Sequence, residues 1–197
     1  MKKILLTVAL IAAAAFSANS QIRVEAVGNL ATVTFSAGSV KQDAKAEFGF
    51  GARAFYAYHL QGDSGFDFGL SFMSTKSTNE ATKGTLCLNN LQLPIHAFYD
   101  LNLGGVKITP YLGLYAGYAL SGKSVFDVSV AKVDADPFAG EGGMKRFDFG
   151  SDDEILVTFG GHFNVGVGVQ ISCLNLCKDK DVDIQYNNLF FSLGYAF

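Results

Sequence analysis

Long apolar runs are missing from most of this chain. After Ser20 no apolar stretch reaches the roughly 20 residues that a membrane-spanning helix requires, although 49% of all residues are hydrophobic. Proline is also scarce, with 3 residues, whereas Gly (22) and Phe (18) are abundant. These proportions argue against a helical membrane protein and are typical of β-strands that have a crowded inner face and a lipid-facing outer face.

The amino terminus has the three parts of an export signal. Lys2-Lys3 is a short basic region, Ile4 to Phe16 is almost entirely apolar, and Ala18-Asn19-Ser20 provides the small residues that a signal peptidase reads. We therefore expect a cleaved signal peptide at residues 1–20 and one mature domain at residues 21–197. An exported chain that is this hydrophobic and has no helical span is either a soluble β protein or a membrane β-barrel.

Basic residues are too few to suggest a nucleic-acid partner. The chain has 15 Lys and Arg against 18 Asp and Glu, and the expected signal peptide contains two Lys and no acid, so the mature balance is 13 − 18 = −5. Nucleic-acid binding would require clustered Lys and Arg. We expect no nucleic-acid partner.

Alternation with a period of two repeats along the mature chain. In residues 47–60, for example, Phe48 and Phe50 fall on one face, and Gly49 and Gly51 fall on the other. A helix cannot produce this alternation, and its repetition predicts an antiparallel sheet. The expected strands are 22–36, 47–60, 65–76, 86–101, 106–121, about 143–150, 155–171 and 182–197.

The first of these strands shows a change of phase near Gly28. The apolar positions are Ile22, Val24 and Ala26 before it and Ala31, Val33 and Phe35 after it. A β-bulge at Gly28 would explain the change and would keep all the apolar residues on the outer face.

The connections alternate in length. Short turns are expected at 61–64, 102–105 and 151–154, and long loops at 37–46, 77–85, 122–142 and 172–181. Residues 124–132 also alternate, which favours an additional hairpin within the third loop. Short periplasmic turns and long external loops are typical of outer-membrane barrels. The sequence therefore predicts an all-β fold, an eight-stranded antiparallel up-and-down transmembrane β-barrel in the outer membrane of a Gram-negative-type bacterium, with both termini periplasmic.

The last strand carries a continuous apolar face. It consists of Leu189, Phe191, Leu193, Tyr195 and Phe197. An exposed edge of this kind would promote aggregation of a soluble protein, whereas in a membrane barrel it faces lipid. We expect this strand to contact outer-membrane lipid and to be the assembly signal that the barrel-assembly machinery reads during insertion.

Four segments resemble a known family. They are Leu91–Ile95, Thr109–Lys123, Lys145–Gly150 and Ser192–Phe197. In this order they resemble the PorT-like outer-membrane β-barrel domain family of Bacteroidota, over nearly the whole mature chain. The resemblance implies a small outer-membrane barrel from a family mostly without assigned function, one branch of which is linked to a secretion machinery. Family members tend to run from the Phe-Asp-Phe-Gly segment straight into a Gly-rich strand, whereas residues 151–154 intervene in this chain.

Seven ionisable residues fall on the inner faces of the expected strands. They are Arg53, His59, Asp67, His96, Asp100, Lys107 and His162. Because the interior of an eight-stranded barrel is only wide enough to be packed by side chains, we expect these groups to pair in a structural polar network. A narrow polar path or a catalytic set is the alternative.

Neither catalysis nor a cofactor is predicted. Asp100 follows His96 by four residues, which separates them by about 13 Å along a strand, and no Gly-x-Ser-x-Gly element occurs. Acidic groups in or beside the connections match no EF-hand loop, so we expect no metal. These groups are Asp134 and Asp136, residues 152–154, and Asp179, Asp181 and Asp183.

The three cysteines suggest a loop staple. An oxidising compartment permits a disulfide between Cys173 and Cys177, provided that the loop folds back. The alternative is three free thiols, and their spacing does not make a zinc site. Because Cys87 is the first cysteine, a lipid-anchored amino terminus is not expected.

Three functions are consistent with these features. We favour a non-enzymatic barrel with a structural or interaction role through its long loops, with a protein partner at the 122–142 loop, because function tends to lie in long loops on a rigid scaffold. The second is a narrow pore or a secretion-machinery accessory barrel. The third, a soluble ligand-binding barrel, is disfavoured because it would require apolar residues inside and polar residues outside.

Overall fold

The computed structural model describes residues 20–197 except 39, 61, 81–82 and 129–130. The predicted signal peptide therefore falls almost wholly outside the described residues. Among the described residues, no helix has the length and apolar character needed to cross a membrane.

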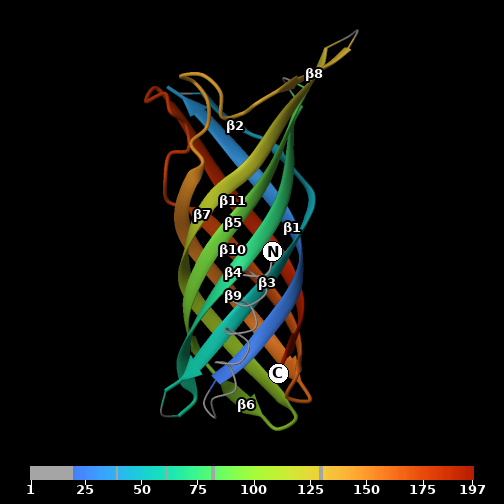
Figure 1. Cartoon of the computed structure of the whole chain (residues 1–197), viewed down its shortest axis with the longest axis vertical. Coiled ribbons are helices and arrows are strands. Elements are labelled where there is room, and N and C mark those ends of the chain that lie inside the picture. The colour runs from blue at the N-terminus through green and yellow to red at the C-terminus, as the bar shows by residue number, and fades with distance from the viewer. Residues whose placement is uncertain (1–19, 39, 61, 81–82, 129–130) are drawn as a thin grey trace, which may run out of the picture.

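Eight long strands form a closed antiparallel barrel (Figure 1). Each pairs with its neighbours in the chain, and the last strand pairs with the first, which closes the sheet. The predicted fold class is confirmed. The long strands are β1 (Ser20–Ala37), β3 (Lys45–His59), β4 (Ser64–Asn79), β5 (Gly84–Tyr99), β7 (Val106–Val128), β9 (Phe147–Phe159), β10 (Phe163–Ser172) and β11 (Val182–Ala196).

Three short strands extend the two ends of the barrel. β2 (Val40–Asp43) pairs with β1, and both β6 (Leu101–Leu103) and β8 (Ala131–Ala135) pair with β7. β2 and β8 lie at the end that carries the long connections, which we call the loop end, and β6 and the carboxyl terminus lie at the opposite turn end (Figure 1). The pairing of β7 with β8 is the additional hairpin expected near residues 124–132.

The predicted turn at 151–154 is wrong. β9 runs through these residues without a break, and the chain turns instead at Gly160 and Gly161, which have φ values of 56° and 77°. Such values favour glycine. The acidic run lies within the strand because Asp152 and Glu154 point into the barrel, where they meet arginine side chains. The barrel still has eight strands, because the sixth (β9) and the seventh (β10) both begin farther along the chain than predicted.

The predicted bulge at Gly28 is also wrong. β1 keeps an unbroken register with both β3 and β11. One face of the strand is buried in the lumen along its whole length, as the side chains of Arg23, Asn29 and Val33 show. The apolar residues change face along β1 because the lumen itself changes from polar to apolar toward the loop end.

The outer face of the barrel is an apolar band. Residues from every part of the sheet contribute, as with Phe48 on β3 and Leu112 on β7, which are 72% and 69% exposed. On β11 the predicted outward positions Phe191 and Leu193 are 52% and 64% exposed, and Phe197 beyond it is 69% exposed. A soluble protein rarely exposes an apolar surface of this extent, and lipid would cover it here.

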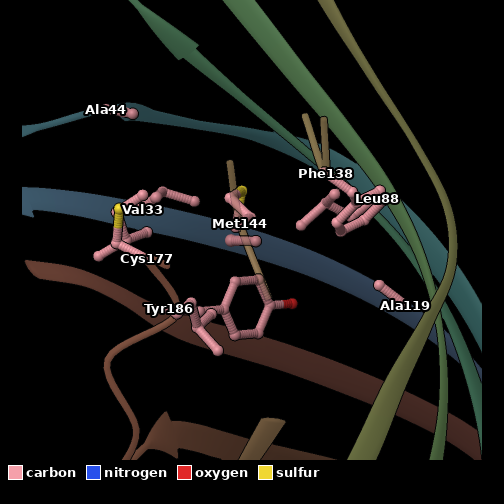
Figure 2. Packing of buried hydrophobic residues seen from close by; sticks show 11 residues of the cluster. Val33, Ala44, Leu88, Ala119, Phe138, Met144, Cys177 and Tyr186 are labelled. Carbon is pink, nitrogen blue, oxygen red and sulfur yellow. The ribbon is translucent and has the colours of Figure 1, made fainter. Parts of the chain in front are cut away.

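The polarity of the barrel reverses toward the loop end. There the exposed side chains include Lys45, Lys76, Lys123 and Gln185, and the interior is an apolar cluster (Figure 2). The cluster joins strand residues to residues of the loops that fold inward. Its buried members are Ala31, Val33, Ala44, Leu88, Ala119, Phe138, Met144, Leu176, Cys177, Ile184 and Tyr186.

Candidate functional site

Seven ionisable side chains from five strands meet in the lumen, in the section surrounded by the apolar band. We call this group the lumen cluster, and each member is at most 4% exposed. It contains four carboxyl groups against two guanidinium groups and one imidazole. Its members are Arg23 and Glu25 on β1, Arg53 on β3, Asp67 on β4, His96 on β5, and Asp152 and Glu154 on β9.

The two arginines hold the carboxylates together. Arg53 donates from Nη2 to Asp152 Oδ2 at 3.0 Å and from Nη1 to Glu154 Oε2 at 3.3 Å. Arg23 donates to Glu25 Oε1 at 2.5 Å and to Asp67 Oδ2 at 3.0 Å. Buried ionised groups require partners of this kind, because each would otherwise carry a large desolvation penalty.

His96 links the two halves of the cluster. Its Nδ1 lies 2.7 Å from Asp67 Oδ1, and its Nε2 lies 3.6 Å from Asp152 Oδ2. Neutral side chains continue the network, since Gln170 donates to Asp152 at 3.0 Å and Ser192 donates to Glu154 at 2.5 Å.

Aromatic rings fill the space between the charges. The ring of Phe55 lies against both guanidinium groups, with the Cζ atoms of Arg23 and Arg53 at 4.4 and 4.6 Å from its centroid. Phe190 lies 4.6 Å from Arg53 and Tyr111 lies 4.5 Å from Arg23. These distances are within cation–π range. The lumen at this height is therefore packed with side chains, as expected for an eight-stranded barrel.

The structure divides the seven predicted lumen residues into three groups. Arg53, Asp67 and His96 belong to the lumen cluster. His59, Asp100 and Lys107 form a separate group nearer the turn end, where Asp100 Oδ2 lies 3.0 Å from Lys107 Nζ and 3.5 Å from His59 Nε2.

His162 does not point into the lumen, contrary to the prediction. It is exposed in the turn between β9 and β10. Its ring stacks on Tyr195 at 5.3 Å, and its Nδ1 lies 2.8 Å from the carbonyl oxygen of Ala196. The prediction placed it inside because it treated 155–171 as one continuous strand.

Sequence reasoning missed four members of the lumen cluster. Arg23 and Glu25 alternate with outward-facing apolar residues, so their inward orientation could have been read from the pattern. Asp152 and Glu154 were assigned to a turn. The pattern that could have revealed them is their alternation with Asp153 and Ile155. In a strand this alternation places Asp152 and Glu154 on one face and Asp153 on the other.

The predicted disulfide between Cys173 and Cys177 is not formed. All three thiols are free, with Cys173 exposed and Cys177 buried. Cys173 Sγ lies 3.9 Å from the carbonyl oxygen of Ile171, whereas Cys177 Sγ lies 3.7 Å from that of Gly142. Cys177 is part of the apolar cluster beside Met144 (Figure 2), so the loop directs the two thiols to different surroundings.

A cavity of about 430 Å³ lies at the loop end. Its walls come from β1, β2, β4, β5, β7 and β11 and from the loop that follows β8. The apolar lining residues include Phe35, Leu86, Phe126, Met144 and Ile184. The polar ones are Gln42, Ser77, Asn79, Thr85 and Ser124. Within the part of the chain that the structure describes, no group of three or more His, Cys, Asp or Glu is placed to hold a metal ion.

The closed barrel, its apolar outer band and its packed polar lumen define a transmembrane β-barrel protein. The Outer membrane protein beta-barrel domain family matches residues 4–197. The chain belongs to this family and is a small β-barrel protein of the bacterial outer membrane. Comparison with curated proteins gives no match.

Solved structures of small outer-membrane proteins have a similar fold. OprG of Pseudomonas aeruginosa is 14% identical with a TM-score of 0.52, over 91% of this chain and 96% of OprG. Neisserial surface protein A is 16% identical with a TM-score of 0.49, over 89% of this chain and 97% of that chain. Ail, the attachment invasion locus protein of Yersinia pestis, is 16% identical with a TM-score of 0.46, over 89% of this chain and 98% of that chain. At these identities the similarity concerns the fold alone.

Proposed function

We propose that this protein is a non-enzymatic outer-membrane barrel whose loop end is a preformed interaction surface outside the cell. Both termini then lie in the periplasm. We further propose that it belongs to the PorT-like branch found in Bacteroidota. The observation that carries the proposal is the way two long loops fold onto each other at the loop end.

The loops at 136–146 and 173–181 are joined by several direct contacts. The backbone N–H of Lys145 donates to the Leu176 carbonyl at 2.6 Å, and that of Lys178 donates to the Gly143 carbonyl at 3.0 Å. The side chain of Lys178 donates to the Phe138 carbonyl at 2.6 Å. Together with the apolar cluster beneath them, these contacts support a surface whose shape is fixed before any partner binds, which reduces the entropy lost on binding.

The β7–β8 hairpin is the part of this surface that extends farthest from the barrel (Figure 1). We propose it as the contact for a protein partner, in keeping with the role expected for the 122–142 loop. The second candidate, a narrow pore or secretion accessory, receives less support because the lumen cluster packs the interior. The soluble ligand-binding barrel is set aside because the chain belongs to an outer-membrane family.

The orientation can be tested with the native thiol at the loop end. In a Cys87→Ser, Cys177→Ser background, a membrane-impermeant maleimide should label Cys173 in intact cells, because this residue is exposed. A matched variant with Cys173→Ser and Asp63→Cys, at the turn end, should be labelled only after the outer membrane is permeabilised. The reverse pattern would contradict the proposed orientation.

The interaction role can be tested by shortening the hairpin. Replacing residues 124–135 with a two-residue turn should leave heat-modifiable migration intact and remove specific cross-linked partners from native outer membranes. Asp63→Ala, at the turn end and outside the proposed surface, is the control. If the same proteins cross-link to the shortened variant, the hairpin is not the contact.

A further inference from the structure

The reversal of polarity divides the barrel into two parts with different interiors. Inside the apolar band, the lumen is polar and packed. Toward the loop end, Val33 and Ile184 point inward and are at most 5% exposed, while lysines and glutamine cover the outside. The loop-end section therefore has the arrangement of a soluble ligand-binding barrel, with apolar residues inside and polar residues outside, set above a sealed transmembrane section.

We propose that the loop-end cavity binds a small uncharged apolar molecule that carries a neutral hydrogen-bonding group. Its volume of about 430 Å³ falls within the range of roughly 300–1,000 Å³ that is typical of small-molecule sites. This site shares Ser124 and Phe126 with the β7–β8 hairpin that we propose as the partner contact, and only the side from which the ligand enters rests on the proposed orientation.

The walls of the cavity present apolar surface that the fold leaves uncovered. Phe126 is 41% exposed although it lines the cavity. Val133, its direct partner on β8, is 50% exposed. Residues directly opposite in an antiparallel pair share a face, so Val133 lies on the same face of the hairpin as Phe126. Beneath them, Met144 and Ile184 close the floor as buried members of the apolar cluster.

The polar lining determines the class of ligand. The hydroxyl groups of Ser77 and Ser124 and the amide of Gln42 can each donate or accept a hydrogen bond. Among the described residues that line the cavity, none is charged. An ionised ligand would lose its hydration without gaining an opposite charge, so the lining favours a neutral polar group on an apolar body, as in a medium-chain alkanol.

The absence of tryptophan from this chain provides a direct test. Phe126→Trp places a single indole on the cavity wall, and Phe147→Trp places a matched one in the lipid-facing band, where Phe147 is 53% exposed. The variants are reconstituted in phospholipid vesicles and titrated with a brominated medium-chain alkanol, whose bromine quenches indole fluorescence on contact. We expect saturable quenching of Phe126→Trp at concentrations about tenfold below those that quench Phe147→Trp, a difference of about 1.4 kcal/mol in binding free energy.

Filling the cavity should abolish the saturable component. Ser124→Phe, added to Phe126→Trp, introduces a ring into the cavity, whereas Val125→Phe on the adjacent outward position is the matched control. A brominated carboxylate of the same length should bind more weakly than the alkanol. Equal binding of the carboxylate would overturn the assignment of a neutral ligand.

Two outcomes would overturn the site itself. Non-saturable quenching that is the same in both Trp variants would mean simple partition into the bilayer. Quenching of Phe126→Trp by a brominated phospholipid in the vesicle would mean that a membrane lipid chain occupies the cavity. If Ser124→Phe fails to fold, the comparison of the two Trp variants still shows whether the alkanol binds in the cavity. Since the protein is purified, the result does not depend on whether the β7–β8 hairpin binds a partner.

Discussion

Arg53 and Asp152 meet across the lumen, with 3.0 Å between Nη2 and Oδ2, although 99 positions separate them in the chain. The pair joins β3 to β9, strands that are not neighbours in the sheet. It therefore couples two walls of the barrel through the interior, and both side chains are fully buried. Removing one member would leave a buried charge without its partner.

Arg53→Met should therefore lower the free energy of unfolding by about 3–5 kcal/mol. The expected loss is large because Asp152 and Glu154 would both lose a guanidinium partner. Urea unfolding in lipid vesicles measures it, with Lys41→Met, at an exposed position, as the matched control. The double variant Arg53→Met, Asp152→Asn should lose less than the sum of the two single changes, and strict additivity would show that the pair is not coupled.

A packed lumen also predicts that the protein does not conduct. At the height of the lumen cluster, Arg53, Phe190 and His96 are each at most 2% exposed, so we expect no continuous water path there. Planar bilayers loaded with wild-type protein should show no conductance steps, with a porin of known conductance as the positive control. Discrete steps from the wild type would contradict the packed lumen and support the pore alternative.

The strand alternation was enough to predict the fold class, because lipid on one side and a narrow interior on the other impose a strict period of two. The prediction from alternation was wrong where an inward-facing position carries an acidic residue or, near the loop end, an apolar one. Asp152 and Glu154 looked like a solvated turn, since their partners are distant in the chain. Val33 looked outward, since the sequence does not reveal that the lumen becomes apolar. The candidate cavity could not be predicted, because its walls come from six strands and an inward-folded loop.

The unbroken path of β9 through residues 151–154 leads to a further prediction. Inserting two glycines between Asp153 and Glu154 should prevent assembly, because the insertion shifts the register with both β7 and β10. The same insertion between Gly160 and Gly161 should be tolerated, because exposed turns accept insertions. Heat-modifiable migration of the two variants gives the comparison. If the first insertion assembled normally, the turn would lie at 151–154 after all.

Asp153 is an acidic residue in the outer apolar band. It faces outward between Leu112 on β7 and Val169 on β10, and its Oδ1 accepts a hydrogen bond of 3.2 Å from the backbone N–H of Gly113. A carboxylate that faces lipid near the middle of the band is unfavourable. Asp153→Leu should therefore raise the free energy of unfolding in vesicles by about 1–2 kcal/mol.

Asp179→Leu, in an exposed part of the loop end, is the matched control and should change stability little. If Asp153→Leu instead destabilises the barrel, or reduces the amount of a cross-linked complex in native membranes, Asp153 contacts a protein partner within the bilayer. The two readouts separate a lipid-facing carboxylate from one that is paired in an assembly.

Phe197, the aromatic residue that follows β11, should matter more for assembly in cells than for stability. The side chain of Phe197 is 69% exposed and so contributes little packing within the barrel, while its backbone N–H donates to the Ile22 carbonyl at 2.9 Å. Phe197→Ser keeps this backbone bond and removes the aromatic ring. We expect the amount of heat-modifiable protein in the outer membrane to fall several-fold, and the unfolding free energy of the refolded protein to change by less than about 1 kcal/mol, the usual scale for exposed positions.

Leu103→Ser, at the same end and 64% exposed, is the matched control and should assemble normally. Equal losses in the two variants would mean that the barrel requires apolar surface at this end in general, and that Phe197 is not a specific assembly signal.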